Sequence, residues 1–191
     1  MATEKFIAKL MTDTKVMTGK VRVSYEHLTK PYAVNGGTEK YSASIIIPKE
    51  GDGGTYEVMQ KAIENAVQAG IEKFGKSFKN AKMHLPIHDG DIEKEGDEAY
   101  ANSWYVNVSN TNAPGIVGPD RKPIEDDTEI YSGMFGRFTI NFYPYSVSGT
   151  GISASLQNFQ KLEDGGALGG TRASANADFG DPDDDDDDLL G

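Results

Sequence analysis

The sequence feature that most constrains the fold is a period-two alternation of apolar and polar side chains across residues 134–145. The two parities differ in chemistry: Phe138, Ile140 and Phe142 on one, and Arg137, Thr139, Asn141 and Tyr143 on the other. Successive side chains of a β-strand point to opposite faces of a sheet, so this alternation predicts a strand with one buried face. A chain with such a strand must build its core against a sheet.

Four other segments carry strand signals, at residues 16–25, 41–48, 104–108 and 152–162. The first has an apolar face and a polar, mostly basic face, formed by Val21, Val23 and Tyr25 and by Lys20, Arg22 and Ser24. A Ser-Gly-Thr-Gly turn at residues 148–151 joins the last two strands as a hairpin. Trp104 shares the parity of Val106 and Val108, so it is expected in the core.

One helix is predicted, between the second and third strands. Apolar residues from Tyr56 to Ile71 recur at helical spacing, with Thr55 as the N-cap and Gly75 as the C-terminal cap. Residues 75–102 and 110–127 read as long connections, the second with Arg121 and Lys122 at an exposed tip. These elements predict a mainly β fold: an OB-fold-like five-stranded antiparallel barrel with one long helix and extended loops.

The C-terminal end has a composition that no globular core explains. From Gly165 onward Gly, Ala, Ser, Asn and Asp dominate, and such a segment buries too little apolar area to offset its ordering entropy. We predict an OB-fold-like domain over residues 1–164 and a disordered Gly-rich linker with an acidic tail over residues 165–191. The tail ends in six aspartates and two leucines: Asp183, Asp184, Asp185, Asp186, Asp187, Asp188, Leu189 and Leu190.

This tail also dominates the net charge, which is −11 from 19 basic and 30 acidic residues. Eight acidic residues lie from Asp178 onward, beyond the last basic residue, Arg172, which leaves 22 acidic against 19 basic residues elsewhere. A net charge of −3 there is compatible with a local basic surface for a polyanion. Extended aspartates are spaced about 3.3–3.6 Å apart, much like the phosphates of a DNA strand. The tail is therefore predicted to imitate a nucleic-acid ligand.

Two short motifs suggest other chemistry but lie in the wrong context. Residues 70–77 fit the phosphate-binding pattern Gly-x-x-x-x-Gly-Lys-Ser, yet they continue the predicted helix instead of joining a strand to a helix. The second motif is a set of metal-type ligands: His84, His88, Asp89 and Asp91. Pro86 breaks the helix that an i, i+4 histidine pair requires, and residues 89–91 read as a turn. We expect no metal, no cofactor and no catalysis, and the absence of cysteine excludes thiol chemistry.

Basic and aromatic side chains recur along the predicted strands. Cations that bind phosphates and flat rings that stack on unpaired bases together hold single-stranded nucleic acid, at about 1–3 kcal/mol per stacked base. The candidate DNA-binding residues are Lys20, Arg22, Lys40, Tyr41, Tyr105, Arg137, Tyr143 and Tyr145. Such residues also suit the exposed face of any sheet, so the prediction concerns the set and no single member.

Several stretches of the chain resemble one known family, the phage-encoded single-stranded DNA-binding proteins. They cover residues 18–25 (TGKVRVSY), 39–49 (EKYSASIIIPK), 85–91 (LPIHDGD), 131–133 (YSG) and 152–157 (ISASLQ). The resemblance implies an OB-fold core, the coating of single-stranded DNA in phage replication or recombination, and no enzymatic activity. The acidic tail resembles those of other single-strand binders, although it ends in Leu-Leu-Gly without a terminal Phe.

The function expected from sequence is thus sequence-independent binding and protection of single-stranded DNA in replication, recombination or repair. The acidic tail is expected to compete with DNA and to recruit replication or recombination proteins, and a neighbouring subunit of a homodimer could receive it. No stretch approaches the roughly 18 apolar residues of a membrane helix, so the expected location is the host cytoplasm. Two alternatives stay open, an acidic interaction protein that binds no DNA and a nucleotide-binding protein.

Overall fold

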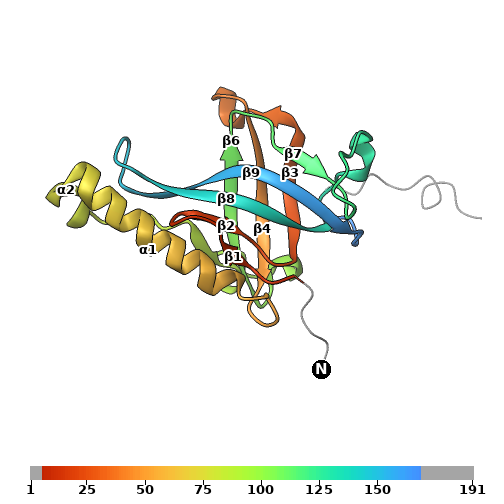
Figure 1. The fold of residues 1–191 in the computed structure, drawn as a ribbon, viewed down its shortest axis with the longest axis horizontal. Helices are drawn as coiled ribbons and strands as arrows, with labels where there is room; N and C mark the ends of the chain where they lie inside the picture. Colours follow the sequence, from red (N-terminus) through yellow and green to blue (C-terminus); the bar gives the residue numbers. More distant parts are fainter. Residues whose placement is uncertain (1–5, 169–191) are drawn as a thin grey trace, which may run out of the picture.

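The computed structural model describes residues 6–168, and its centre is a ring of five strands (Figure 1). The ring consists of β3 (Val21–Tyr32), β4 (Lys40–Pro48), β6 (Ser103–Asn110), β8 (Phe135–Tyr145) and β9 (Gly151–Glu163). β3 pairs with β4, β4 with β6, β6 with β9, β9 with β8, and β8 with β3 again. The predicted OB-fold-like arrangement is confirmed, with one difference. The β6–β9 contact, at Ser109 and Ser155, is parallel.

The core of the ring consists of the apolar side chains that occupy every second position of each strand. Phe138, Ile140 and Phe142 of β8 are at most 1% exposed, as the alternation predicts. β4 contributes Ala43, Ile45 and Ile47 to the same core, and Trp104 packs against it from β6. Burial of such side chains contributes about 1.5–3 kcal/mol each, so the parity of every strand is fixed by the core.

The predicted first strand is divided in two. β2 (Lys15–Met17) pairs with the middle of β8, and β3 begins after Thr18, whose hydroxyl accepts the Phe138 N–H at 3.0 Å. β1 (Lys9–Leu10) pairs with the outer edge of β2. In β3 a register shift between Ser24 and His27 inserts an extra residue, and Tyr25 has φ 45°. Tyr25 is therefore 62% exposed, and its predicted place on the apolar face is wrong.

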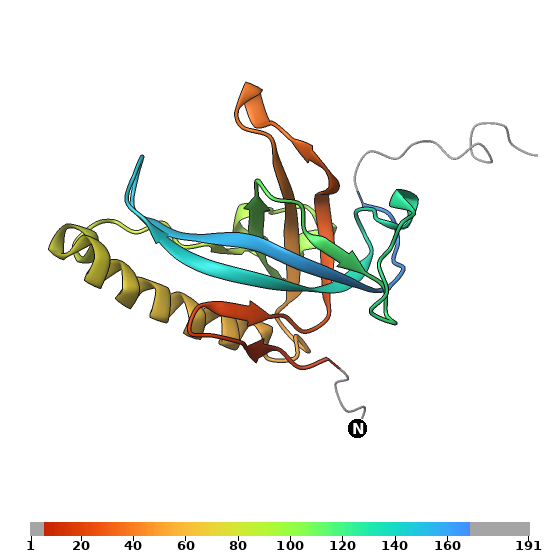
Figure 2. The same ribbon diagram turned by 45° about the horizontal axis from the view of Figure 1, so that its top comes forward.

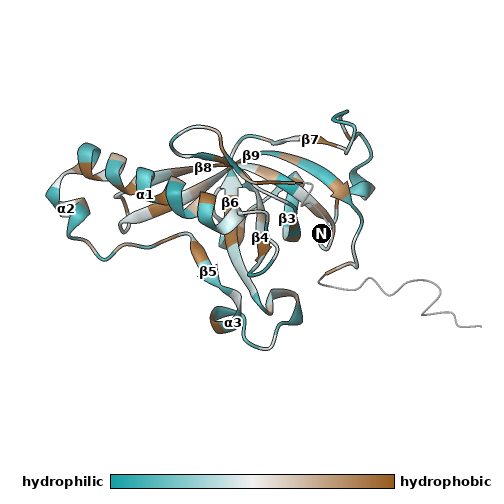
Figure 3. Cartoon of the chain, turned by 60° about the horizontal axis from the view of Figure 1, so that its bottom comes forward, coloured by the Kyte–Doolittle hydropathy of each residue, from teal (hydrophilic) through white to brown (hydrophobic). Residues whose placement is uncertain are grey.

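The predicted helix is α1 (Thr55–Phe74), which packs mainly against β8. Hydrophilic and hydrophobic residues alternate along it in Figure 3, consistent with one face toward the strands. Thr55 is not the N-cap: the Asp52 carboxylate accepts the N–H groups of Gly54 and Tyr56 at 2.9 Å, while Thr55 is buried within the helix. Gly75 ends the helix at φ 77°, as predicted.

The long connections contain short elements that sequence did not reveal. They are α2 (Lys76–Lys79), β5 (Ile87–Asp89), α3 (Gly90–Glu93), η2 (Glu98–Tyr100), β7 (Gly115–Val117) and η3 (Asp127–Glu129). A further short helix, η1 (Val34–Gly36), lies at the tip of the β3–β4 hairpin, which projects from the ring in Figure 2. β5 pairs with β6 and brings the segment from α3 to η2 beside the ring.

After β9, the chain up to residue 168 lies against the segment that precedes β8. Tyr131 Oη lies 2.8 Å from Asp164 Oδ1, and the Leu168 N–H donates to the Ser132 carbonyl at 2.8 Å. The contacts of residues 165–168 extend beyond the predicted domain boundary, and the rest of the predicted tail lies outside the described residues. Within residues 6–168, no helix is both long and apolar enough to cross a membrane.

Candidate nucleic-acid interface

On β3, β4 and β6, every second side chain points away from the core of the ring. These side chains, among them Arg22, Ile46 and Tyr105 at paired positions, form a surface that we name the outer face. Oligonucleotides commonly bind the corresponding second and third strands of OB folds, which here are β4 and β6. Two adjacent hollows of about 360 and 350 Å³ lie on the outer face, and Ala99 of η2 lines both. The outer face is therefore bounded by the segment from α3 to η2.

The first hollow brings two cations and a ring together. Lys20, Arg22 and Phe135 line it, with Lys20 Nζ 5.0 Å and the Arg22 guanidinium carbon 5.5 Å from the Phe135 ring centroid. Lys20 also forms an ion pair with Glu163 at 2.5 Å, while Arg22 donates to the Gly166 carbonyl at 2.7 Å. Both groups are only partly buried, so phosphates can reach them in exchange for these partners.

The second hollow carries aromatic rings that sequence parity did not assign. Tyr25 and His27 line it, and the His27 ring stacks on that of Tyr32 with centroids 4.6 Å apart. Tyr25 and Tyr32 are 62% and 54% exposed, so each has ring surface available to a base. Only the bulge and the pairing with β4 place these rings, and no local sequence signal marks them.

Lys94 is another residue that sequence did not reveal. Its Nζ lies 5.7, 5.6 and 5.7 Å from the ring centroids of Tyr25, Tyr100 and Tyr105, close enough for cation–π attraction. The α3–η2 segment thus places an ammonium group over three rings of the outer face.

Tyr105, a predicted stacking residue, is 5% exposed and cannot offer a free ring face. Its hydroxyl donates to Glu93 Oε2 at 2.8 Å, and Tyr100 packs edge-on against its ring. Burial, followed by the Glu93 carboxylate, raises the pKa of Tyr105 to about 12. The hydrogen bond from Tyr105 lowers the pKa of Glu93. Tyr105 therefore anchors the α3–η2 segment over β6.

The other predicted residues do not form one surface. Arg137 donates to the carbonyls of Thr18 and Ile7, and burial lowers the pKa of its guanidinium. Tyr41 packs against the main core, whereas Lys40 is exposed opposite Tyr32. Tyr143 is 44% exposed and Tyr145 is half-buried, both near the β8–β9 turn. Arg137 is thus hydrogen-bonded to backbone carbonyls, and Tyr41 packs partly buried against the core.

The two competing motifs also have structural partners. Gly70 lies inside α1 against Phe78 and Pro144, so residues 70–77 cannot wrap a phosphate. Lys49 Nζ binds Asp89 at 2.7 Å and Asp91 at 2.8 Å; the bond to Asp89, then that to Asp91, raises the pKa of Lys49. Among residues 6–168, no three acidic or histidine side chains are grouped to hold a metal ion.

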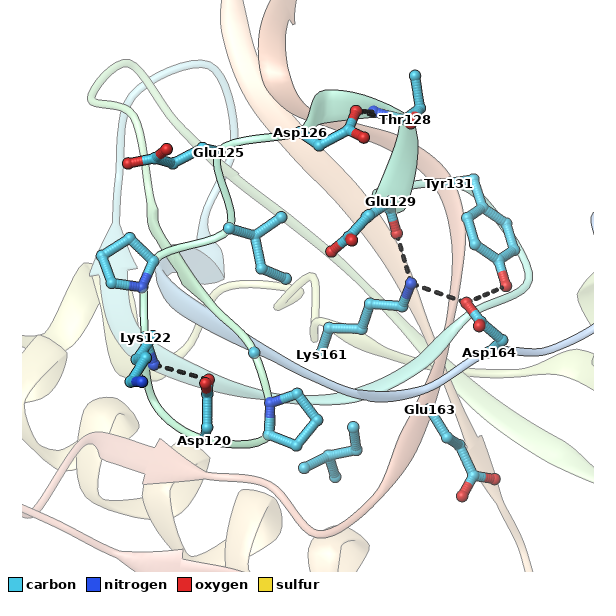
Figure 4. Close-up of a pocket in the computed structure, with 15 residues that line it drawn as sticks. Asp120, Lys122, Glu125, Asp126, Thr128, Glu129, Tyr131, Lys161, Glu163 and Asp164 are labelled. Atoms are coloured by element: carbon cyan, nitrogen blue, oxygen red, sulfur yellow. Dashed lines mark hydrogen bonds and ion pairs between the residues drawn. The ribbon is translucent and has the colours of Figure 1, made fainter.

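A larger hollow lies elsewhere, between the η3 loop and the end of β9 (Figure 4). It measures about 980 Å³ and carries six carboxylates and two amines: Asp120, Glu125, Asp126, Glu129, Glu163 and Asp164, with Lys122 and Lys161. Lys161 Nζ binds Asp164 and the Glu129 carbonyl, both at 2.7 Å. A polyanion is repelled there, so the outer face remains the candidate interface.

The ring and the outer face together define a protein of the OB-fold type. Residues 14–190 match the family described as the single-stranded DNA-binding protein of Enterobacter phage Enc34, and the chain belongs to this family. Protein p50 of Acyrthosiphon pisum secondary endosymbiont phage 1 is 32% identical over 174 residues, which cover 87% of this chain and 93% of that protein.

The fold is shared with solved structures of other phage proteins. The single-stranded DNA-binding protein from bacteriophage Enc34, in complex with single-stranded DNA, has a TM-score of 0.71 and 24% identity. The match covers 87% of this chain and all of that chain. The single-stranded DNA-binding protein gp2.5 encoded by bacteriophage T7 has a TM-score of 0.60 and 15% identity over 90% of this chain and 97% of that one.

Proposed function

We propose that the chain binds single-stranded DNA on its outer face without sequence preference and coats it during phage DNA replication, recombination or repair. The observation that carries this proposal is that the cations Lys20 and Arg22 line a hollow next to the one lined by the exposed Tyr25, in a chain of the Enc34 family. The exposed ring of Tyr32 lies further along β3. Cations replace the counterions of phosphates and rings stack on bases, and neither contact reads a sequence. This function requires no catalysis, and it places the protein in the host cytoplasm.

Among the residues predicted from sequence, we propose direct DNA contacts for Lys20, Arg22 and Lys40 on β3, β4 and the residues beside them, and for Tyr143 of β8 near the β8–β9 turn. Arg137 and Tyr105 act indirectly, since one holds the N-terminal segment on β8 and the other holds the α3–η2 segment. Tyr25, Tyr32 and Lys94 join the proposed contacts because they border the same surface.

The tail has a place in this proposal because its first residues already lie on the outer face. Arg22 donates to Gly166, and Leu168 packs against the cluster of Ile46, Tyr100 and Tyr105. We propose that the aspartates from Asp178 onward compete with DNA for the basic groups, in the same copy or in a homodimer partner. Displaced by DNA, the tail then recruits replication or recombination proteins through Leu189 and Leu190.

The DNA-binding proposal is tested by fluorescence anisotropy with a labelled oligothymidylate at two or more salt concentrations. Arg22→Gln should weaken binding and make the salt dependence shallower, because each lost phosphate contact changes the slope by about 0.7 for a single strand. Tyr143→Ala should weaken binding with the slope nearly unchanged. Arg121→Gln is the matched control, since this exposed arginine makes the same charge change away from the outer face. If the unmodified chain does not bind the oligonucleotide at low salt, the proposal is wrong.

The tail proposal is tested in the full chain by replacing the six aspartates at 183–188 with asparagine. Affinity for DNA should rise, most at low salt, because screening weakens the competition at high salt. Replacement of Leu189 and Leu190 by serine should leave DNA affinity unchanged and reduce partner binding. Unchanged affinity of the asparagine variant at every salt concentration would refute the competition.

A further inference from the structure

Four lysines lie within ten residues at one end of the molecule, where α1 meets α2. Lys73, Lys76, Lys79 and Lys82 are all exposed, and within residues 6–168 none of them forms an ion pair. We name this group the lysine end. Lys73 and Lys76 stabilise the C-terminus of α1 through its dipole, but Lys79 and Lys82 lie beyond that terminus. Helix stabilisation therefore does not explain the whole group.

The backbone that carries these lysines is held firmly on the domain. Phe78 of α2 is completely buried, and its ring stacks on Phe74 with centroids 5.6 Å apart. Gly70 allows this packing, because a Cβ there would come within 2.4 Å of the Phe78 ring and 2.8 Å of Pro144. The lysine side chains are therefore flexible, while the backbone that carries them is held in place by this packing.

The same segment is joined to the turn between β8 and β9. His84 N–H donates to the Thr150 carbonyl at 2.9 Å, and the His84 carbonyl accepts from Ile152 N–H at 3.0 Å. This turn connects the fourth and fifth strands of the ring, and that loop borders the nucleic-acid surface of OB folds. Near it, Tyr143 and Val147 are 44% and 83% exposed. Ring surface and unpaired ammonium groups thus lie at one corner.

We propose that the lysine end is a second phosphate-binding site, which holds the backbone of a DNA strand that continues past the β8–β9 turn. This inference rests on the proposed function and extends the bound length beyond the outer face. The ligand is the phosphodiester backbone, because four separate ammonium groups without a shaped pocket neutralise charge and read no base.

The test is Lys76→Gln, Lys79→Gln and Lys82→Gln together, in the full chain. Anisotropy is measured with oligothymidylates of about 6 and about 20 nucleotides, since one OB fold covers roughly 4–16. Affinity for the long strand should fall at least about tenfold at low salt, and its salt slope should become shallower by about 2, because three phosphate contacts are lost. Affinity for the short strand should change less than about twofold.

The matched control removes three exposed lysines elsewhere, Lys9, Lys61 and Lys122, and so makes the same change in net charge. Equal losses in both triple variants, or equal losses for both strand lengths, would overturn the second site. A loss that disappears when residues 183–188 are asparagine would mean that the lysines bind the tail instead, which also overturns it. If the unmodified chain binds neither strand, the proposed function has failed, and that result is distinct from these outcomes.

Discussion

The two ends of the long axis of the molecule carry opposite charge. The lysine end lies at α2, and the carboxylate-lined hollow lies at the other end, near η3 (Figure 1). At the lysine end the charges are unpaired and lie on a convex helix corner. At the carboxylate end the hollow is large, and its buried amine is already neutralised by Asp164.

This contrast shows that the size of a hollow says little about whether its charge favours a polyanion. The hollow with six carboxylates disfavours phosphates, whereas the smaller hollow that Lys20 and Arg22 line and the exposed lysine end present positive charge. The sign of the local charge decides, because unlike charges near a protein surface attract by several kcal/mol at contact, at the effective dielectric of such sites. Steering of DNA along the molecule should therefore run from the outer face toward α2.

The largest expected effect concerns Phe78, whose buried ring holds the lysine end on the domain. Phe78→Ala should lower the free energy of unfolding by roughly 3 kcal/mol, near the low end for a buried Phe because α2 can detach locally. Urea denaturation measures this loss. The variant should also lose the preference for long strands while it still binds short ones.

Phe78→Leu is the companion variant, since it keeps most of the buried volume and should keep the lysine end in place. If Phe78→Ala still prefers long strands, the lysines do not need the packing of Phe78 to bind DNA. The proposed contrast between the lysine end and the carboxylate end would then lose its structural basis.

A smaller effect is expected at the carboxylate end. The carboxylates of Glu125 and Glu129 accept no hydrogen bond within residues 6–168, so Glu125→Gln with Glu129→Gln should leave the fold intact. Affinity should rise by about twofold at low salt for short and long strands alike, because a distant repulsion is removed and salt screens it. Anisotropy with both strand lengths checks this. A rise confined to long strands would mean that DNA runs toward this end.

The smallest effect concerns Asp164, the last residue of the predicted domain. The hydrogen bond from Lys161, followed by that from Tyr131, lowers the pKa of Asp164. A lowered pKa stabilises the fold above the unfolded value of about 3.9, and this contribution is lost as the pH falls through the folded pKa. Asp164→Asn should therefore shift the urea midpoint down slightly at pH 7, and the difference should vanish near pH 2.

Asp127→Asn provides the control, because its carboxylate makes no hydrogen bond within the described chain and should shift the midpoint at neither pH. A difference for Asp164→Asn that persists at acid pH would show that the ion pair with Lys161 is not its cause.

Elements whose signals are local could be predicted from the amino-acid sequence. The alternation at Phe138, Ile140 and Phe142 and the helical spacing after Thr55 are periods that the chain carries within a few turns or pleats. Gly75 ends α1 because it adopts a positive φ at little cost. These features give the number and order of the main strands and the place of the helix between them.

Which residues share a surface depends on the tertiary structure. Lys20 meets Glu163 and Arg22 meets Gly166 across more than 140 residues, contacts that no local pattern encodes. One inserted residue turns Tyr25 outward, while the α3–η2 segment covers Tyr105, although both tyrosines lie on predicted strands. A strand period assigns a side chain to one of two faces. Whether that face is open, covered or shifted by a bulge depends on segments that fold onto it from elsewhere in the chain.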